Sequence, residues 1–287
     1  MITGSAGQLG YELQRTAPRD AALLPVDIDT LDLTDADAVD AFIGSHRPST
    51  IINGAAYTAV DRAESEPDLA HKVNVTAAAT LAEAARRHGA RVIQISTDFV
   101  FGGATARPWR PDDPTAPQSV YGTTKRDGET AVHAALGSRA LVIRTAWLYS
   151  AHGGNFVKTM LRVMRERNEV RVIADQIGTP TWAHSLARTI WAAVFQPGVS
   201  GTLHWTDAGV ASWYDFAVAI QEEALGRGLL ERSVPVHAIA TSEYPTPAAR
   251  PSYSVLDKSD TIRLLGVEPT HWRVNLRQML DEVRDDA

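Results

Sequence analysis

The first half of the chain alternates between short apolar segments and longer segments in which apolar residues recur with helical spacing. The apolar segments predict strands at 23–26, 50–53, 91–95 and 140–143. The helical spacing predicts helices that begin near Thr34 and span 68–88 and 120–136. This alternation is typical of βαβ units, whose parallel sheet is covered by helices on both faces. We therefore predict an α/β fold with a Rossmann-type, doubly wound parallel sheet.

The pattern loosens after about Trp147. Helices are still predicted near 156–167, 185–195, 213–225 and 276–283, with proline-rich turns between some of them. We predict a dinucleotide-binding domain with the catalytic residues at 1–147. A smaller, irregular substrate-binding region is predicted at 148–287, interleaved with the first.

The first predicted strand is short, with about three residues before a glycine loop, where strands usually have about five or six. We therefore expect a few native residues upstream of Met1. The N-terminus has no basic segment followed by an apolar one, as a secretory signal would. No apolar run approaches the roughly 18 residues of a membrane-spanning helix. A cytoplasmic protein without membrane contact is expected.

Composition excludes several kinds of chemistry. The 287 residues include no cysteine, so disulfides, thiolate metal sites and a cysteine nucleophile are excluded. A net charge of −6 argues against a broad nucleic-acid surface. No histidine pair with a zinc-binding pattern and no Gly-x-Ser-x-Gly segment occurs. Most of the seven tryptophans, Trp213 among them, are predicted to be core or pocket-wall residues.

Gly4, Gly7 and Gly10 form a Gly-x-x-Gly-x-x-Gly loop between the first strand and the first helix. Glycines in this place allow a tight turn, close approach to a pyrophosphate, and close packing of the helix on the strand. The helix N-terminus offers free N–H groups to the phosphates. Asp27 ends the second strand, where a carboxylate binds the adenosine ribose. These features predict dinucleotide binding. The acid at position 27 favours NAD(H), with use of both cofactors left open.

Tyr121 and Lys125 have i, i+4 spacing and share one face of a predicted helix. A nearby ammonium favours the phenolate and lowers the tyrosine pKa from about 10. Such a phenol can donate a proton to a carbonyl oxygen as hydride reaches the carbon. Thr97 lies where the fourth strand ends, which is where open α/β sheets bind ligands. The alternatives are a surface pair and a turn-capping threonine.

Several motifs resemble the extended short-chain dehydrogenase/reductase family. These are Gly4-x-x-Gly7-x-x-Gly10, 53–61 (NGAAYTAVD), 96–101 (STDFVF) and Tyr121-x-x-x-Lys125. Within that family the chain is similar to the dTDP-4-dehydrorhamnose reductases, and this similarity covers essentially the whole sequence. It is carried by 59–64 (AVDRAE), 144–147 (RTAW), 155–160 (NFVKTM), 175–181 (DQIGTPT) and 244–251 (YPTPAARP).

The resemblance implies reduction of the C4 ketone of dTDP-4-dehydro-β-L-rhamnose by NADH or NADPH. Tyr121 is then the proton donor, and Lys125 holds the nicotinamide ribose and tunes Tyr121. Thr97 adjusts the carbonyl environment, and with Asp98 and Trp147 it contacts the sugar.

Further binding residues follow from the same resemblance. Asn155 belongs to the substrate site, and Arg250 suits the nucleotide diphosphate because a planar guanidinium matches phosphate, the alternative being a loop salt bridge. The expected cofactor-binding residues are Gly4, Gly7, Gln8, Leu9 and Gly10 at the pyrophosphate, Asp27 at the ribose, Asp32 and Leu33 at the adenine, and Ala56, Tyr57 and Thr58 along the third strand.

Two positions depart from the family pattern. Tyr57 replaces the histidine of some members, and His184 stands where a second glutamate would bind Mg²⁺ together with Glu12. Histidine is a poor ligand for Mg²⁺, so a metal-bridged dimer is in doubt, and a monomer or another homodimer is as well supported. We therefore predict no metal ligands.

Other functions stay open from the sequence. The chain can be a reductase or epimerase of another nucleotide deoxysugar. It can also be a non-catalytic partner, like the regulatory subunit of methionine adenosyltransferase, which resembles the same family. Rhamnose for an envelope polysaccharide and a deoxysugar for a secondary metabolite would require nearly the same residues.

Overall fold

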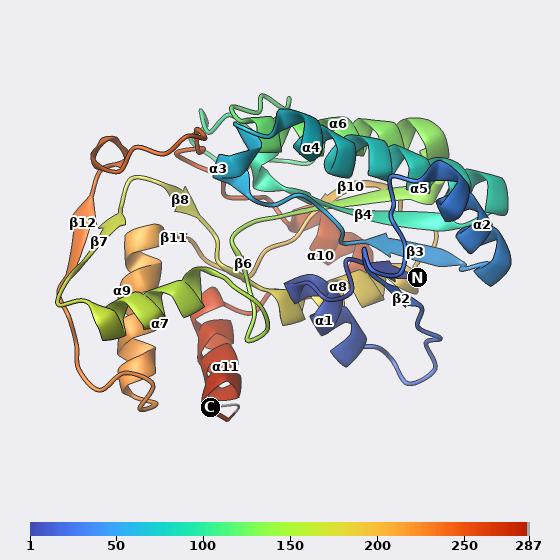
Figure 1. The fold of residues 1–287 in the computed structure, drawn as a ribbon. Coiled ribbons are helices and arrows are strands. Elements are labelled where there is room, and N and C mark those ends of the chain that lie inside the picture. The colour runs from blue at the N-terminus through green and yellow to red at the C-terminus, as the bar shows by residue number, and fades with distance from the viewer. Residues whose placement is uncertain (286–287) are drawn as a thin grey trace.

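The computed structural model describes residues 1–285, and a six-stranded parallel sheet lies at its centre (Figure 1). The strand order is β10-β5-β4-β3-β1-β2. The bounds are β1 (Ile2–Thr3), β2 (Pro25–Val26), β3 (Thr50–Asn53), β4 (Arg91–Thr97), β5 (Ala140–Thr145) and β10 (Gly201–His204). Each neighbouring pair is parallel. The predicted doubly wound α/β fold is confirmed.

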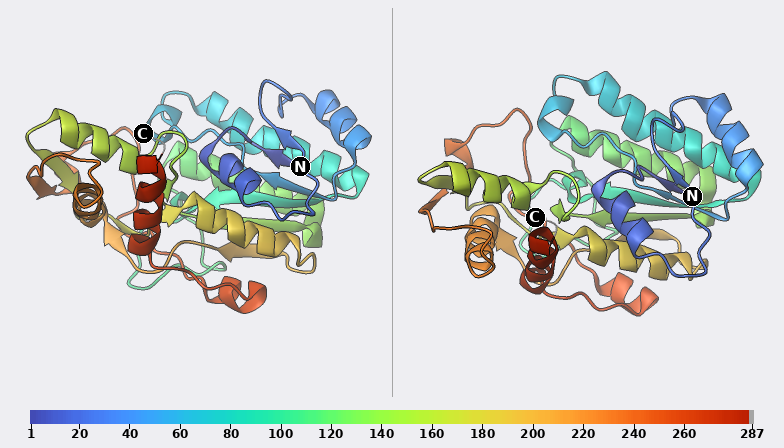
Figure 2. Two further views of the ribbon diagram at one scale, coloured as in Figure 1. Left: turned by 90° about the horizontal axis from the view of Figure 1, so that it is seen from below. Right: turned by 60° about the horizontal axis from the view of Figure 1, so that its bottom comes forward.

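Helices cover both faces of this sheet (Figures 1 and 2). One face carries α1 (Gln8–Arg15), α8 (Ala183–Val194) and α10 (Ser259–Leu265), and the other carries α2 (Ala36–His46), α5 (Ala77–His88) and α6 (Val120–Leu136). Successive strand residues point to opposite faces. Accordingly, Ile51 and Val92 are buried in the core with α2, α5 and α6, whereas Ile52 and Ile93 are buried in the core with α1 and α8.

The helix expected at 68–88 is interrupted. It consists of α4 (Pro67–His71), a π-helical turn η1 (Lys72–Thr76) and α5, which ends at Gly89 in the left-handed conformation, as predicted. The side chain of Asn74 in η1 donates to the Thr124 hydroxyl (3.1 Å) and accepts from the Tyr57 amide (2.8 Å). These contacts with other segments decide the local geometry, which helical spacing alone does not reveal.

The expected cap of the second helix is also different. Asp35, not Thr34, is the N-cap of α2, because its side chain accepts from the Ala38 amide (3.0 Å). The Thr34 hydroxyl instead donates to Asp32 (2.7 Å). By contrast, α6 begins and ends where the sequence predicts, with Ser119 as its N-cap.

The second half forms a smaller lobe beside the sheet, seen at the left of Figure 1. Its core joins α7 (Phe156–Glu166), α9 (Trp213–Leu225) and α11 (Trp272–Asp285). Three small sheets pair β6 (Leu148–Tyr149) with β9 (Thr181–Trp182), β7 (Val170–Ile173) with β12 (Val236–Ile239), and β8 (Ile177–Gly178) with β11 (Ala211–Ser212). The remaining helical segments are α3 (Val60–Ala63), η2 (Asp98–Val100), η3 (Gly137–Arg139) and η4 (Thr241–Glu243).

Three elements of the second half belong to the sheet region in space. The strand β10 pairs with β5, α8 packs on α1, and α10 packs on β10 and α8. The functional division at residue 147 stays a prediction. Within residues 1–285, no helix is both long and apolar enough to cross a membrane.

Candidate active site

A cavity of about 870 Å³ opens at the carboxyl ends of the sheet strands. The strand order reverses at β1, because β2 and β3 lie on opposite sides of it. Open α/β sheets bind ligands outside the strand ends at this kind of reversal. The predicted site residues that line the cavity are Gly4, Gly7, Gln8, Leu9, Gly10, Asp27, Asp32, Leu33, Ala56, Thr58, Thr97, Asp98, Tyr121, Lys125, Trp147 and Asn155.

The glycine loop forms one end of this cavity. Gly4 has φ +64°, and a Cβ there would lie 2.9 Å from the Ala55 amide nitrogen. A Cβ on Gly10 would lie 2.2 Å from the Gly4 carbonyl oxygen. Gly4 therefore lets the glycine loop approach the loop after β3 closely, and Gly10 lets α1 pack against the glycine loop. The first turn of α1 presents free N–H groups to the cavity.

Asp27 braces the glycine loop from the end of β2. Its carboxylate accepts hydrogen bonds from the amides of Ala6 (2.8 Å) and Ile28 (2.8 Å). Asp32 accepts from the amide (2.8 Å) and hydroxyl (2.7 Å) of Thr34, and these bonds lower its pKa. Both acids thus line the cavity with fixed geometry, and their contact with an adenosine stays a prediction.

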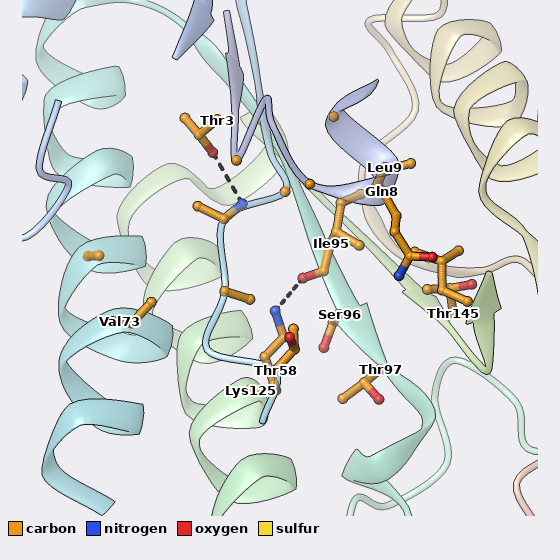
Figure 3. Close-up of a pocket in the computed structure, with 18 of the residues that line it drawn as sticks. Thr3, Gln8, Leu9, Thr58, Val73, Ile95, Ser96, Thr97, Lys125 and Thr145 are labelled. Atoms are coloured by element: carbon orange, nitrogen blue, oxygen red, sulfur yellow. Dashed lines mark hydrogen bonds between the residues drawn. The ribbon is translucent and has the colours of Figure 1, made fainter. Parts of the chain in front are cut away.

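Two hydroxyl groups in the cavity have no hydrogen-bond partner among the described residues. These are the buried Oγ of Ser96 and Oγ1 of Thr145, which Figure 3 shows near Thr97 and Gln8, respectively. Buried hydroxyls normally have partners, so a polar ligand is expected to supply them. Together with the glycine cradle, they show that the residues present fit a dinucleotide.

Tyr121 and Lys125 lie on the face of α6 that turns toward β4. A Cβ on Gly122 would lie 2.3 Å from the Phe99 carbonyl oxygen, so glycine allows this close approach. The Lys125 ammonium donates to the Ile95 carbonyl (2.7 Å; Figure 3). Burial lowers the pKa of Lys125 to about 8, opposed by the Glu129 carboxylate.

Burial raises the pKa of Tyr121 to about 12, opposed by a hydrogen bond with Thr97. The sequence-based expectation that Lys125 lowers this pKa is therefore wrong for this structure. Removal of the phenol from water is the main cause of the shift, and the Lys125 ammonium is directed to a backbone carbonyl instead. The raised pKa keeps Tyr121 neutral at physiological pH.

Asp98 is buried beside Thr97, which donates a hydrogen bond to its carboxylate (3.0 Å). Burial raises the pKa of Asp98 to about 6, opposed by Ser254 and Thr97. Asn155 caps α7 and also donates to the side chain of Gln8 (3.0 Å). This contact joins the second half of the chain to the glycine loop.

Two predicted site residues, Tyr57 and Arg250, do not line the cavity. The Tyr57 hydroxyl donates to Glu66, while its backbone amide is held by Asn74. Arg250 forms an ion pair with Asp61 (2.7 Å), which is the salt bridge considered as the alternative. Its contact with a diphosphate stays a prediction.

Glu12 and His184, the two positions compared with the Mg²⁺-binding glutamates of some family members, are adjacent. The buried Glu12 carboxylate lies 3.3 Å from His184 Nδ1 and is also held by Arg15 and Ser150. Within the described part of the chain, no three His, Asp or Glu side chains are grouped to hold a metal ion.

Sequence reasoning missed several lining residues. Ser96, Thr145 and Ala146 lie within the quoted motifs 96–101 and 144–147, and Leu148 follows the second, so strand-end position could have found them. Val73 and Ala77 reach the cavity from η1 and α5. Nothing in their local sequence distinguishes them from core residues, because only the packing of that interrupted helix brings them there.

The family model for the RmlD substrate binding domain matches residues 1–285. The chain belongs to this family. The RmlD family accounts for both halves of the molecule, since the match spans the sheet region and the smaller lobe.

Individual relatives agree with this family assignment. The dTDP-4-dehydrorhamnose reductase of Escherichia coli K12 is 40% identical over 99% of this chain and 97% of its own length. A probable dTDP-4,6-dihydroxy-2-methyloxan-3-one 4-ketoreductase of Streptomyces antibioticus is 43% identical over 99% and 95%. The Bacillus anthracis dTDP-4-dehydrorhamnose reductase, solved in complex with NADP, is 37% identical over 98% of both chains with a TM-score of 0.92.

Proposed function

We propose that this protein is an NAD(P)H-dependent reductase that converts the C4 ketone of dTDP-4-dehydro-β-L-rhamnose to the alcohol of dTDP-L-rhamnose. One observation carries the proposal. Thr97, Tyr121 and Lys125 stand on the wall of a cavity that begins at a dinucleotide-type glycine loop, in a member of the RmlD family. The full-length similarity to dTDP-4-dehydrorhamnose reductases supports the choice of substrate.

The dinucleotide supplies a hydride when bound. The chain contributes the rest of the chemistry. The first turn of α1 binds the pyrophosphate, and Asp27 accepts hydrogen bonds from the adenosine ribose. Tyr121 is neutral because its pKa is raised to about 12, so it can donate its proton to the oxygen that develops negative charge. Thr97 holds that oxygen, and Lys125 binds the nicotinamide ribose.

The choice between NADH and NADPH belongs to this proposal. Asp27 disfavours a 2′-phosphate by like charge. The Bacillus anthracis relative is described with NADP, which shows that members of the family accommodate the phosphate. We therefore expect activity with both cofactors and a preference for NADH.

A second substrate is favoured by a specific observation. The Streptomyces antibioticus relative bears the name of a 4-ketoreductase for another dTDP-linked deoxysugar, and its identity to this chain is no lower than that of the rhamnose enzymes. The same Thr97, Tyr121 and Lys125 arrangement would serve both, since the reacting group is a C4 ketone in each.

The test is a panel of dTDP-4-keto-6-deoxysugars with each cofactor, followed by the loss of NADH or NADPH absorbance. Oxidation with dTDP-4-dehydrorhamnose supports the proposal, and faster oxidation with another sugar favours the second substrate. Turnover without added cofactor would indicate an epimerase with a retained nicotinamide. Absence of any turnover, together with capture of a synthetase partner, would indicate the regulatory-subunit alternative.

Location and assembly complete the proposal. We place the enzyme in the cytoplasm, with a small nucleotide sugar as its partner and neither nucleic acid nor membrane as a ligand. The Glu12–His184 contact supports a monomer, or a homodimer that forms without Mg²⁺, because the glutamate is already held by Arg15. Sedimentation with and without a chelator tests this.

A further inference from the structure

Trp147 is held in a conformation that side-chain-bearing residues rarely adopt. Its φ is +48°, in the left-handed region. It follows β5, in which Thr145 pairs with Thr97 of β4, so it stands at the strand ends near the proposed reaction centre. Backbone strain of this kind persists only where the surroundings enforce it, and it concentrates at functional sites.

Two neighbours enclose the indole of Trp147. The ring of Trp213 stacks on it, with ring centroids 3.5 Å apart and planes inclined by 6°. At Gly178, an added Cβ would lie 2.6 Å from indole Cε2 and 2.7 Å from Nε1. Gly178 does not have a positive φ, so the position requires glycine for space and not for backbone freedom.

One small sheet supplies both neighbours. Gly178 lies in β8, which pairs with β11, and Trp213 is the next residue after β11. Ser212 caps α9 through Asp215, with its hydroxyl accepting the Asp215 amide (3.0 Å). Phe156 packs against the Trp213 ring at 4.7 Å. The position of Trp213 is thus fixed by backbone pairing, a helix cap and a further aromatic contact.

We propose that Trp213 and Gly178 are positioning residues for the reductase, holding the Trp147 indole between them so that its uncovered edge contacts the hexose of the sugar nucleotide. Trp213 is not among the cavity-lining residues, so it acts through Trp147. The uncovered edge of an indole combines apolar ring carbons with one N–H donor, which suits the mixed surface of a pyranose. This inference rests on the proposed function for the identity of the sugar.

The kinetic test compares Trp213→Leu and Gly178→Ala with the wild type. Each substitution should raise the KM for the sugar nucleotide by about tenfold. The inhibition constant of dTDP and the affinity for the dinucleotide should stay unchanged, because neither ligand contains the hexose. Trp213→Phe should restore most of the loss, since a phenyl ring can still stack. An equal weakening of dTDP binding would overturn the proposal.

Trp205→Phe is the matched control. Trp205 is buried in the core beneath the sheet, away from the stacked pair, and its indole N–H has no hydrogen-bond partner in the described residues. The Trp205→Phe variant should leave the KM for the sugar nucleotide unchanged. Stacked indoles couple their electronic transitions, so far-ultraviolet circular dichroism should show a couplet. The couplet should disappear in Trp213→Leu and persist in Trp205→Phe; persistence in both would overturn the proposal.

Double variants separate this role from a general effect on folding. In a Trp147→Ala background, Gly178→Ala and Trp213→Leu should raise KM no further, because the indole they hold is gone. A further rise would contradict action through Trp147. If the wild type fails to reduce any sugar nucleotide, the proposed function fails, while the couplet still decides whether the aromatic pair exists.

Discussion

Burial moves the two central ionisable groups of the site in opposite directions. It raises the pKa of Tyr121 to about 12 and lowers that of Lys125 to about 8. Each shift favours the neutral form, because a charge is unfavourable away from water. A neutral phenol is the state that reduction requires, whereas Lys125 begins to lose its charge slightly above physiological pH.

The pH dependence of kcat/KM follows from these values. Lys125 is charged below its pKa and neutral above it, so kcat/KM should fall as the pH rises through about 8. The pKa of Tyr121 is too high to cause this fall in kcat/KM. The arginine of Lys125→Arg stays charged at all accessible pH values. In this variant kcat/KM should no longer fall near pH 8, even if activity is lower. If kcat/KM of that variant still fell near pH 8, another group would be responsible for the fall.

Substitution of the proton donor gives a second prediction. Tyr121→Phe should lower kcat by about 10²–10⁴, the usual contribution of a positioned acid. Dinucleotide affinity, measured by calorimetry, should change little, because only one hydroxyl is removed. Tyr214→Phe, in α9, is the matched control and should keep wild-type turnover. Near-wild-type kcat in Tyr121→Phe would show that another group donates the proton.

At the scale of elements, close backbone approaches hold the site together. The helix α1 contacts its own loop at Gly10, and α6 reaches η2 at Gly122, each where a Cβ would meet a carbonyl oxygen at 2.2–2.3 Å. The strand β10, from late in the chain, completes the sheet beside β5. Precise helix–loop contacts therefore define the cavity more than any individual element does.

Gly10→Ala tests this packing. Alanine in a helix is normally more stable than glycine by about 0.5–1 kcal/mol. Here the clash with Gly4 should outweigh that gain, and unfolding in urea should show a loss of about 1–3 kcal/mol with weaker dinucleotide binding. Gly198→Ala, where an added Cβ meets nothing within 4 Å, is the control. Equal stability of the Gly10 variant and the wild type would contradict the packing argument.

At the scale of the whole molecule, contacts between distant segments close the cavity. Asn155 of the second half donates to Gln8 in the first turn of α1, and Ser150 donates to Glu12. Arg250 in the late loop pairs with Asp61 of α3. The two halves of the chain are thus joined beside the cavity, and the late loop is already tied to α3.

The role of Arg250 can be separated from that of its ion pair. The pair is partly exposed, so Arg250→Gln should change the free energy of unfolding by less than about 1 kcal/mol. If Arg250 also binds the diphosphate, as the sequence predicts, Arg250→Gln should weaken dTDP binding, whereas Asp61→Asn should not. Calorimetric titration with dTDP measures both. Equal weakening in the two variants would assign the effect to the ion pair alone.

Local sequence determined much of this protein. The strand–helix alternation predicts the doubly wound sheet, and the cap and spacing of α6 predict its bounds, because hydrophobic period and capping chemistry are local properties. The glycine loop, Asp27, Thr97 and the Tyr121–Lys125 pair were likewise visible, since each occupies a strand end or one helical face. Their roles in binding and catalysis stay predictions.

Only the tertiary structure decided the environment of these groups. The Tyr121 pKa rises because folding buries the phenol beside Phe99, Ala63 and Ala70, and Arg250 meets Asp61 across 189 residues of chain. The stacking of Trp147 on Trp213 and the space left at Gly178 likewise depend on β8 pairing with β11. Burial, ion pairing and aromatic contact depend on which distant segments meet, and that information is not contained in any local pattern.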